Sequence, residues 1–72
     1  MIEPGQLRQW RLTDANWDLK DKLQGRIFLV LESKVREEDR IGVPTWFILM
    51  DERREWHYEF FIENNSAVLT NR

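Results

Sequence analysis

The chain has 72 residues, no cysteine and a single histidine, His57. Without cysteine it can form neither a disulfide nor a thiolate metal site, and it offers no thiol nucleophile. His57 shares a predicted strand face with Glu59 and Glu63, but one histidine and two carboxylates make an incomplete site. We therefore expect no metal and no cofactor. We also expect no enzymatic activity, because no nucleophile and no acid–base pair emerges from the sequence.

Long apolar runs and an excess of one charge are missing as well. The longest apolar runs, residues 27–31 and 46–50, fall far short of the roughly 20 residues that a membrane helix requires. Eleven Lys and Arg oppose 13 Asp and Glu, whereas a dedicated nucleic-acid binder usually carries a strong basic excess. Residues 1–5 lack the basic and apolar regions of a signal peptide. These absences predict a soluble, cytoplasmic protein with no membrane partner, and they make nucleic acid an unfavoured one.

Large aromatic side chains, by contrast, are abundant: the chain has four Trp, four Phe and one Tyr. A chain this short buries only about 60% of the surface that its unfolded form exposes. Each large aromatic side chain can bury roughly 150–250 Å². We infer that an aromatic core takes the place of a disulfide in one domain, residues 1–72. Dimerisation or docking onto a partner is the other way to gain stability.

Alternation of apolar and polar residues predicts five short strands. The expected strands are residues 6–12, 26–34, 45–50, 55–62 and 67–70, with a turn at 64–66. A long excursion, residues 13–24, separates the first two strands and contains a helical turn that begins at Thr13 or Asp14. A bulge is expected between Leu7 and Trp10, and the second strand, apolar on both faces, should be central. Residues 36–40 are charged throughout and predict an exposed hairpin tip.

The hairpin of residues 45–62 decides which side chains face solvent. No Asn-Gly or Asp-Gly pair is present, so we expect a four-residue loop at residues 51–54. The predicted buried face then holds Phe47, Leu49, Trp56, Tyr58 and Phe60. The predicted outward face holds Trp46, Ile48, Met50, His57 and Glu59. A three-residue loop would invert this assignment, because a slip of one residue flips every side chain.

Three segments carry a resemblance to a known family: residues 4–7, residues 25–31, and residues 46–51 running into Trp56 through a short charged turn. In these segments the chain resembles small SH3-like barrel proteins, including short ones encoded by tailed bacteriophages such as those of cyanobacteria. Family members often have Gly in the last turn, where this chain has Glu52, Arg53 and Arg54. The resemblance implies an all-β fold, a five-stranded SH3-like barrel, and a location in the host cell or the virion. It implies no chemistry, because such barrels serve many functions.

We interpret the chain as a non-enzymatic protein-binding module, either a small virion component in assembly or a binder of a host protein, with a homo-oligomer as an open alternative. Exposed Trp, Met and Arg are typical of protein interfaces. The predicted contact residues are Trp17, Trp46, Ile48, Met50, His57 and Glu59. The alternative is a nucleic-acid-associated accessory domain of the transcription or translation type. Its contacts would be arginines with an interleaved tryptophan, namely Arg8, Trp10, Arg11, Arg26, Arg53 and Arg54.

Overall fold

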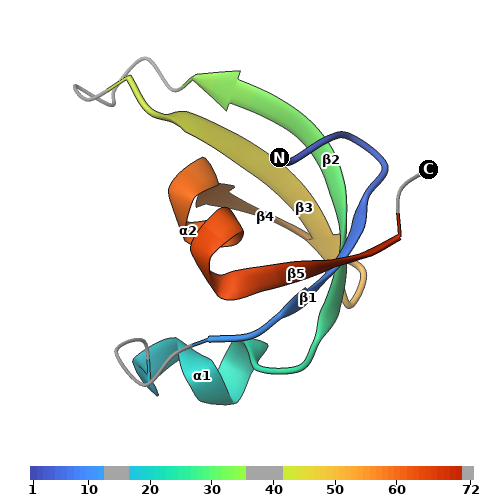
Figure 1. Ribbon diagram of the computed structural model, residues 1–72, viewed down its shortest axis with the longest axis vertical. Coiled ribbons are helices and arrows are strands. Elements are labelled where there is room, and N and C mark those ends of the chain that lie inside the picture. Colours follow the sequence, from blue (N-terminus) through green and yellow to red (C-terminus); the bar gives the residue numbers. More distant parts are fainter. Residues whose placement is uncertain (13–16, 36–41, 71–72) are drawn as a thin grey trace.

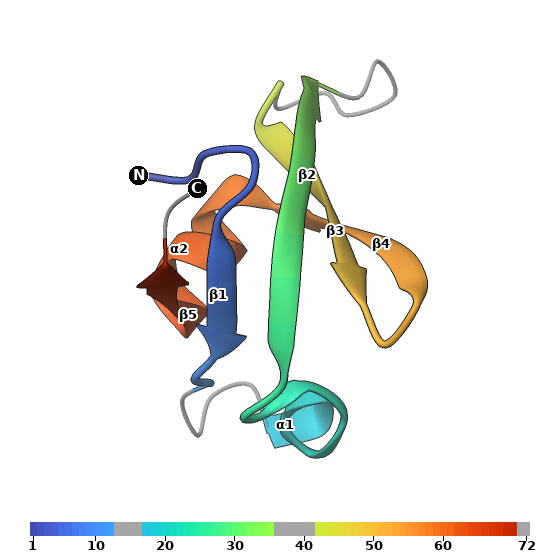
Figure 2. The same ribbon diagram turned by 90° about the vertical axis from the view of Figure 1, so that its right-hand side faces the viewer.

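A computed structural model describes residues 1–12, 17–35 and 42–70 of the chain. In chain order its elements are β1 (Leu7–Trp10), α1 (Trp17–Leu23), β2 (Ile27–Val35), β3 (Pro44–Met50), β4 (Arg53–Tyr58), α2 (Glu59–Asn65) and β5 (Ser66–Thr70). The five strands form one antiparallel sheet in the order β4-β3-β2-β1-β5 (Figure 1). The expectation of a mostly β fold is confirmed. The sheet curves strongly but does not close into a barrel, since β4 and β5 form its two edges (Figure 2).

The interior strands are placed as the sequence predicted. β2 lies between β1 and β3, in agreement with the apolar residues on both of its faces. The irregularity expected in the first strand is present, because the pairing of β1 with β5 shifts register between Leu7 and Arg8. β1 pairs with both β2 and β5, so the N-terminal strand also lies inside the sheet.

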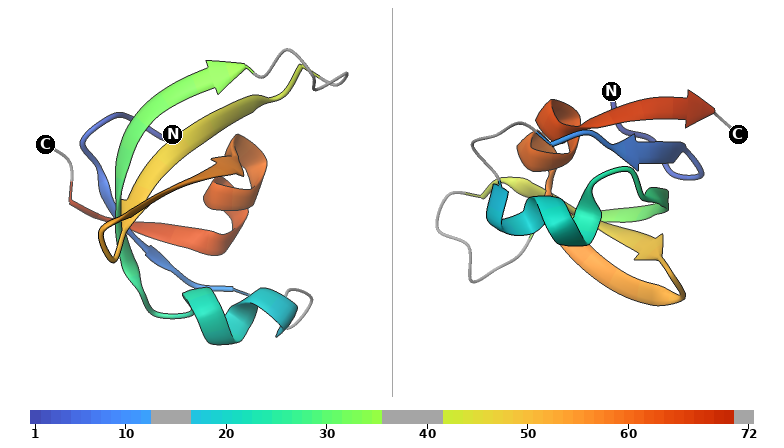
Figure 3. Two further views of the ribbon diagram at one scale, coloured as in Figure 1. Left: turned by 180° about the vertical axis from the view of Figure 1, so that it is seen from behind. Right: turned by 90° about the horizontal axis from the view of Figure 1, so that it is seen from below.

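The core lies on the concave side of the sheet, where α2 packs (Figures 1 and 3). Inward-facing side chains of β1, β2 and β3 meet Ile62 of α2 there, and Trp10, Phe28 and Ile48 are almost completely buried. The rings of Trp10 and Phe28 lie 4.5 Å apart. The buried apolar residues are Ile2, Trp10, Leu12, Leu23, Phe28, Val30, Trp46, Ile48, Met50 and Ile62. An aromatic core does form, but its members are not those predicted for the hairpin.

α1 confirms the helical turn expected in the excursion between the first two strands. Leu23 is buried against the core, and Lys20 and Lys22 lie in the last turn, where cations interact favourably with the helix dipole. Gly25 ends the helix with a φ of 80°, a left-handed conformation that glycine adopts without strain. The start of the turn at Thr13 or Asp14 and the charged tip at residues 36–40 lie outside the described residues.

α2 is the element that the sequence analysis missed. The prediction of strand as far as residue 62, and of a turn at residues 64–66, is wrong, because the chain turns helical at Glu59. Tyr58, Phe61, Ile62 and Asn65 are spaced i, i+3, i+4 and i+7, which is the apolar pattern of one helix face. Ile62 and Asn65 are buried, and Phe61 packs against the core. The residues from 56 onward also alternate as in a strand, and for this reason the sequence analysis did not recognise the helical spacing.

The β3–β4 hairpin has a two-residue turn instead of the expected four-residue loop. Met50 pairs with Arg53, and Asp51 and Glu52 have φ values of 52° and 67°. Positive φ at both central residues is what a type I′ turn requires, and here two acidic residues adopt it in place of Asn-Gly. The shorter turn moves the pairing by two residues, so the sets of residues that share a face are unchanged.

The direction in which each face points is nevertheless the reverse of the prediction. Trp46, Ile48 and Met50 are buried, at most 6% exposed. Leu49, Trp56 and Phe60 are between 37% and 55% exposed. The physical reason is that the concave side, already lined by Trp10, Phe28 and Ile62, is completed by the side chains of Trp46, Ile48 and Met50.

Candidate protein-binding surface

Three of the predicted contact residues cannot meet a partner. Trp46, Ile48 and Met50 lie in the core, so the expectation that they form an exposed patch is wrong. The Trp46 indole Nε1–H donates a hydrogen bond to Glu59 Oε2 at 2.8 Å, which joins β3 to the first turn of α2. Glu59 therefore satisfies a core tryptophan. The side chain of Trp17 lies outside the described part of the structure.

His57 is half-buried at the edge of the core. Its ring meets Trp10 edge-on at 5.1 Å and stacks on Phe61 at 5.6 Å. Its Nε2 lies 3.4 Å from Glu55 Oε1. Burial lowers the pKa of His57, and the hydrogen bond and charge of Glu55 raise it in part. The His57 ring is thus partly buried by its neighbours, whereas the sequence predicted an exposed side chain.

The residues predicted for nucleic-acid contact divide into buried and exposed members. Trp10 is completely buried, and its Nε1 finds no hydrogen-bond acceptor among the described residues. Arg8 is 4% exposed and donates from Nε to Ser66 Oγ at 2.8 Å and from Nη1 to Gln6 Oε1 at 3.0 Å. Burial lowers the pKa of the Arg8 guanidinium, against the attraction of Glu63. The exposed members are Arg11, Arg26, Arg53 and Arg54.

Exposed aromatic rings gather where β4 runs into α2. Trp56 meets Tyr58 edge-on at 5.3 Å, and Tyr58 stacks on Phe60 at 5.5 Å, so the three rings form a continuous row. Trp56 is 40% and Phe60 55% exposed. With Leu19 of α1, His57 and Phe61, they line an open hollow of about 270 Å³. We call Leu19, Trp56, Tyr58 and Phe60 the aromatic surface.

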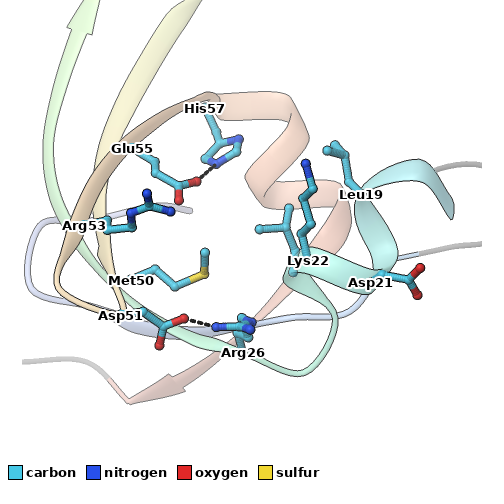
Figure 4. Close-up of a pocket in the computed structure, with 10 residues that line it drawn as sticks. Leu19, Asp21, Lys22, Arg26, Met50, Asp51, Arg53, Glu55 and His57 are labelled. Carbon is cyan, nitrogen blue, oxygen red and sulfur yellow. Dashed lines mark hydrogen bonds and ion pairs between the residues drawn. The ribbon is translucent and has the colours of Figure 1, made fainter.

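A second hollow adjoins the first, between α1 and the β3–β4 hairpin (Figure 4). It measures about 410 Å³ and shares Leu19 and His57 with the aromatic hollow. Its other lining residues are Asp21, Lys22, Leu23, Arg26, Met50, Asp51, Arg53 and Glu55. We call it the charged groove, because its rim is ionic while Leu23 and Met50 give it an apolar floor.

The outer face of the sheet also carries an apolar feature. Leu7, Leu29 and Leu49 lie side by side across β1, β2 and β3, and Arg54 follows Leu49 in the same row. Arg54 pairs with Glu32 at 3.0 Å and lies over the Phe47 ring at 5.1 Å. Leu29, Leu49 and Arg54 line an open hollow of about 540 Å³ on this face, together with Gly5, Val30, Leu31 and Glu32, and no aromatic ring lines it.

The aromatic surface could have been anticipated only in part. The alternation of Trp56, Tyr58 and Phe60 was recognised in the sequence but assigned to the core. Lys22 gave no signal, because its proximity to the hairpin depends on how the excursion folds back. Sequence patterns describe neighbours within an element, and this surface joins α1 to β4 and α2.

Within residues 1–12, 17–35 and 42–70, no group of three His, Cys, Asp or Glu side chains is placed to hold a metal ion. In that same part of the chain, neither helix has the length and apolar character needed to cross a bilayer.

No protein-family model, no curated protein and no solved structure matches the chain.

Proposed function

We propose that this chain is a non-enzymatic protein-binding module and that the aromatic surface is its contact site. One observation carries the proposal: Trp56, Tyr58 and Phe60 form a continuous row of rings whose two ends, Trp56 and Phe60, are exposed, whereas Trp10, Phe28 and Trp46 are buried in the core. Exposed clusters of large apolar side chains are typical of protein interfaces, and Trp and Tyr supply much of the binding energy there.

The residues around the only histidine support the non-enzymatic part of the proposal. His57 faces the charged groove beside Glu55, a pairing that can hold a proton. The side chains that line this groove include no hydroxyl and no thiol, so no nucleophile of the serine, threonine or cysteine type adjoins the pair. The His57 ring also packs against the rings of Trp10 and Phe61, which is typical of a structural side chain.

The expected partner is a virion protein during assembly or a protein of the host cell, as the resemblance to phage-encoded SH3-like barrels implies. The strand order β4-β3-β2-β1-β5, with a long excursion after β1, supports the proposal that the chain is an open variant of that class. The nucleic-acid alternative is a weaker proposal. Trp10 and Arg8 are buried, which leaves Arg11, Arg26, Arg53 and Arg54 for phosphate contact.

The test is affinity capture from host lysate, followed by binding of the purified candidate. The bait is the wild-type chain, a Trp56→Ser/Phe60→Ser variant, or a Leu49→Ser control that removes an exposed apolar side chain from the outer face. We expect a captured protein that survives nuclease and moderate salt, and that loses about tenfold or more in affinity only with the double variant. Capture that disappears with nuclease would favour the nucleic-acid alternative. Equal binding by all three baits would contradict the proposal.

A further inference from the structure

The charged groove is open to solvent directly beside the aromatic surface. Figure 4 shows Lys22 of α1 and Arg53 of β4 extending into it from opposite walls. Both side chains are exposed, and neither makes a hydrogen bond or ion pair with any residue that the structure describes. Two cations thus face the same cavity without an anionic partner of their own.

The carboxylates at this groove are already engaged or directed elsewhere. Asp51 forms an ion pair with Arg26, and Glu55 lies beside His57. Asp21 points away from the cavity in Figure 4. The lining holds three cations, Lys22, Arg26 and Arg53, and three carboxylates, but only two of the carboxylates point into the groove, so the charges that face it have a positive excess, to which His57 adds when it is protonated. The groove is complementary to a ligand that brings one negative charge.

The floor of the groove strengthens that complementarity. Met50 and Leu23 lie at its base and are almost fully buried, so a bound charge would meet apolar surface on one side. Pairing between charges strengthens as water is excluded from around them. The shared residues Leu19 and His57 leave no barrier between this end and the row of aromatic rings.

We propose that the two hollows form one site, which takes a short segment of a partner protein with a large apolar side chain next to an acidic one. The apolar side chain packs against Trp56, Tyr58 and Phe60, and the carboxylate lies between Lys22 and Arg53. This inference rests on the proposed function and adds to it the chemistry of the partner. Recognition here needs both halves, since a carboxylate alone would meet only exposed cations in water.

The test uses three short peptides with blocked ends, identical except for a central Phe-Glu, Phe-Gln or Ala-Glu pair. Each is titrated into the isotopically labelled chain, and binding is followed by amide and indole chemical shifts. We expect Phe-Glu to shift residues of both hollows and to bind about tenfold more tightly than Phe-Gln, the value of one charge-assisted contact. It should also bind about tenfold more tightly than Ala-Glu, which lacks the apolar ring. Lys22→Gln and Arg53→Gln should remove the preference for Phe-Glu over Phe-Gln.

Arg54→Gln is the matched control, because it removes the same charge from the next residue of β4, on the opposite face, and should preserve the preference. Equal binding of Phe-Glu and Phe-Gln at the aromatic surface, both weakened by Trp56→Ser, would overturn this inference and leave the proposed function intact. Loss of the preference in Arg54→Gln as well would also overturn it. No shift at either hollow with any of the three peptides would contradict both proposals. Unchanged melting temperatures of the variants would establish that the effects are local.

Discussion

The two faces of the β3–β4 hairpin are almost equally apolar in sequence, but they differ in burial. One face holds Trp46, Ile48 and Met50, which are buried, and the other holds Leu49 and Trp56, which are more than a third exposed. Alternation along a strand states which side chains share a face, but the core itself decides which face turns inward. A hairpin with two apolar faces is therefore ambiguous until the rest of the fold is known.

Partners on the concave side resolve that ambiguity here. Trp46 has a hydrogen-bond acceptor in Glu59 of α2, and the core around it includes Trp10, Phe28 and Ile62. On the outer side, Phe47 meets only the guanidinium of Arg54 among the ring contacts of the described residues. The inward face is thus selected by elements distant in sequence, and the outward rings remain available for binding.

The largest contrast is expected between two tryptophan truncations. Trp46→Ala should destabilise the fold by about 3–5 kcal/mol, the usual range for a buried Trp. Trp56→Ala should cost about 1 kcal/mol, mainly the ring contact with Tyr58. Urea unfolding of both variants measures the difference. Similar losses in the two variants, or a larger loss in Trp56→Ala, would reverse the assignment of the faces.

A smaller effect should follow from removing the hydrogen bond that anchors the inner face. Trp46→Phe leaves the carboxylate of Glu59 without its donor, and we expect a loss of about 1.5–3 kcal/mol, as for hydrogen bonds to charged groups. Glu59→Gln keeps an acceptor and should cost less. If Glu59→Ala destabilises wild type and Trp46→Phe equally, the two residues are not coupled.

The hairpin turn should tolerate, and gain from, a glycine. Glu52 has a φ of 67°, and a left-handed conformation costs a non-glycine residue roughly 1–2 kcal/mol. Glu52→Gly should therefore raise the free energy of unfolding by about 1 kcal/mol, after its greater flexibility in the unfolded chain is subtracted. The control Asp51→Ala, which keeps the strained φ and breaks the pair with Arg26, should give no gain. A loss of stability in Glu52→Gly would contradict the turn geometry.

The smallest expected effect is a dependence of stability on pH at the border between the two faces. Burial lowers the pKa of His57 in the folded protein, so the unfolded chain takes up the proton first as the pH falls. Stability should fall as the pH drops through about 6.5, the pKa of an unperturbed histidine, and stay level above it. Glu55 raises the pKa of His57 in part and so reduces the effect, while Lys22 and Arg53 line the same groove.

Thermal melts of wild type and His57→Phe across this range measure the contribution. Phe retains the ring contacts with Trp10 and Phe61 and cannot titrate. The difference in stability between the two proteins should therefore shift in favour of His57→Phe at acidic pH. A difference that is constant with pH would show that His57 titrates equally in the folded and unfolded states.

Local patterns predicted the strands better than the surface. Five strands, a central β2, a short helix in the excursion and an irregularity after Leu7 follow from alternation, turn residues and spacing. α2 was missed because Tyr58 and Ile62 fit both the alternation of a strand and the spacing of a helix. The gathering of the exposed rings, and the position of Lys22 opposite Arg53 in the charged groove, depend on how segments distant in sequence pack together. No period along the chain encodes that meeting.

The buried hydrogen bond from Arg8 to Ser66 joins residues 58 positions apart. The bond lies where β1 pairs with β5. Because β5 follows all the other described strands in chain order, β1 gains its second neighbour last. We expect folding to be slow for this size, because the ends of a long loop must meet before the contacts reward them. On the ribosome, Arg8 has no acceptor at Ser66 until that residue has been synthesised. The nascent chain therefore leaves one side of β1 without a neighbouring strand until β5 has been synthesised.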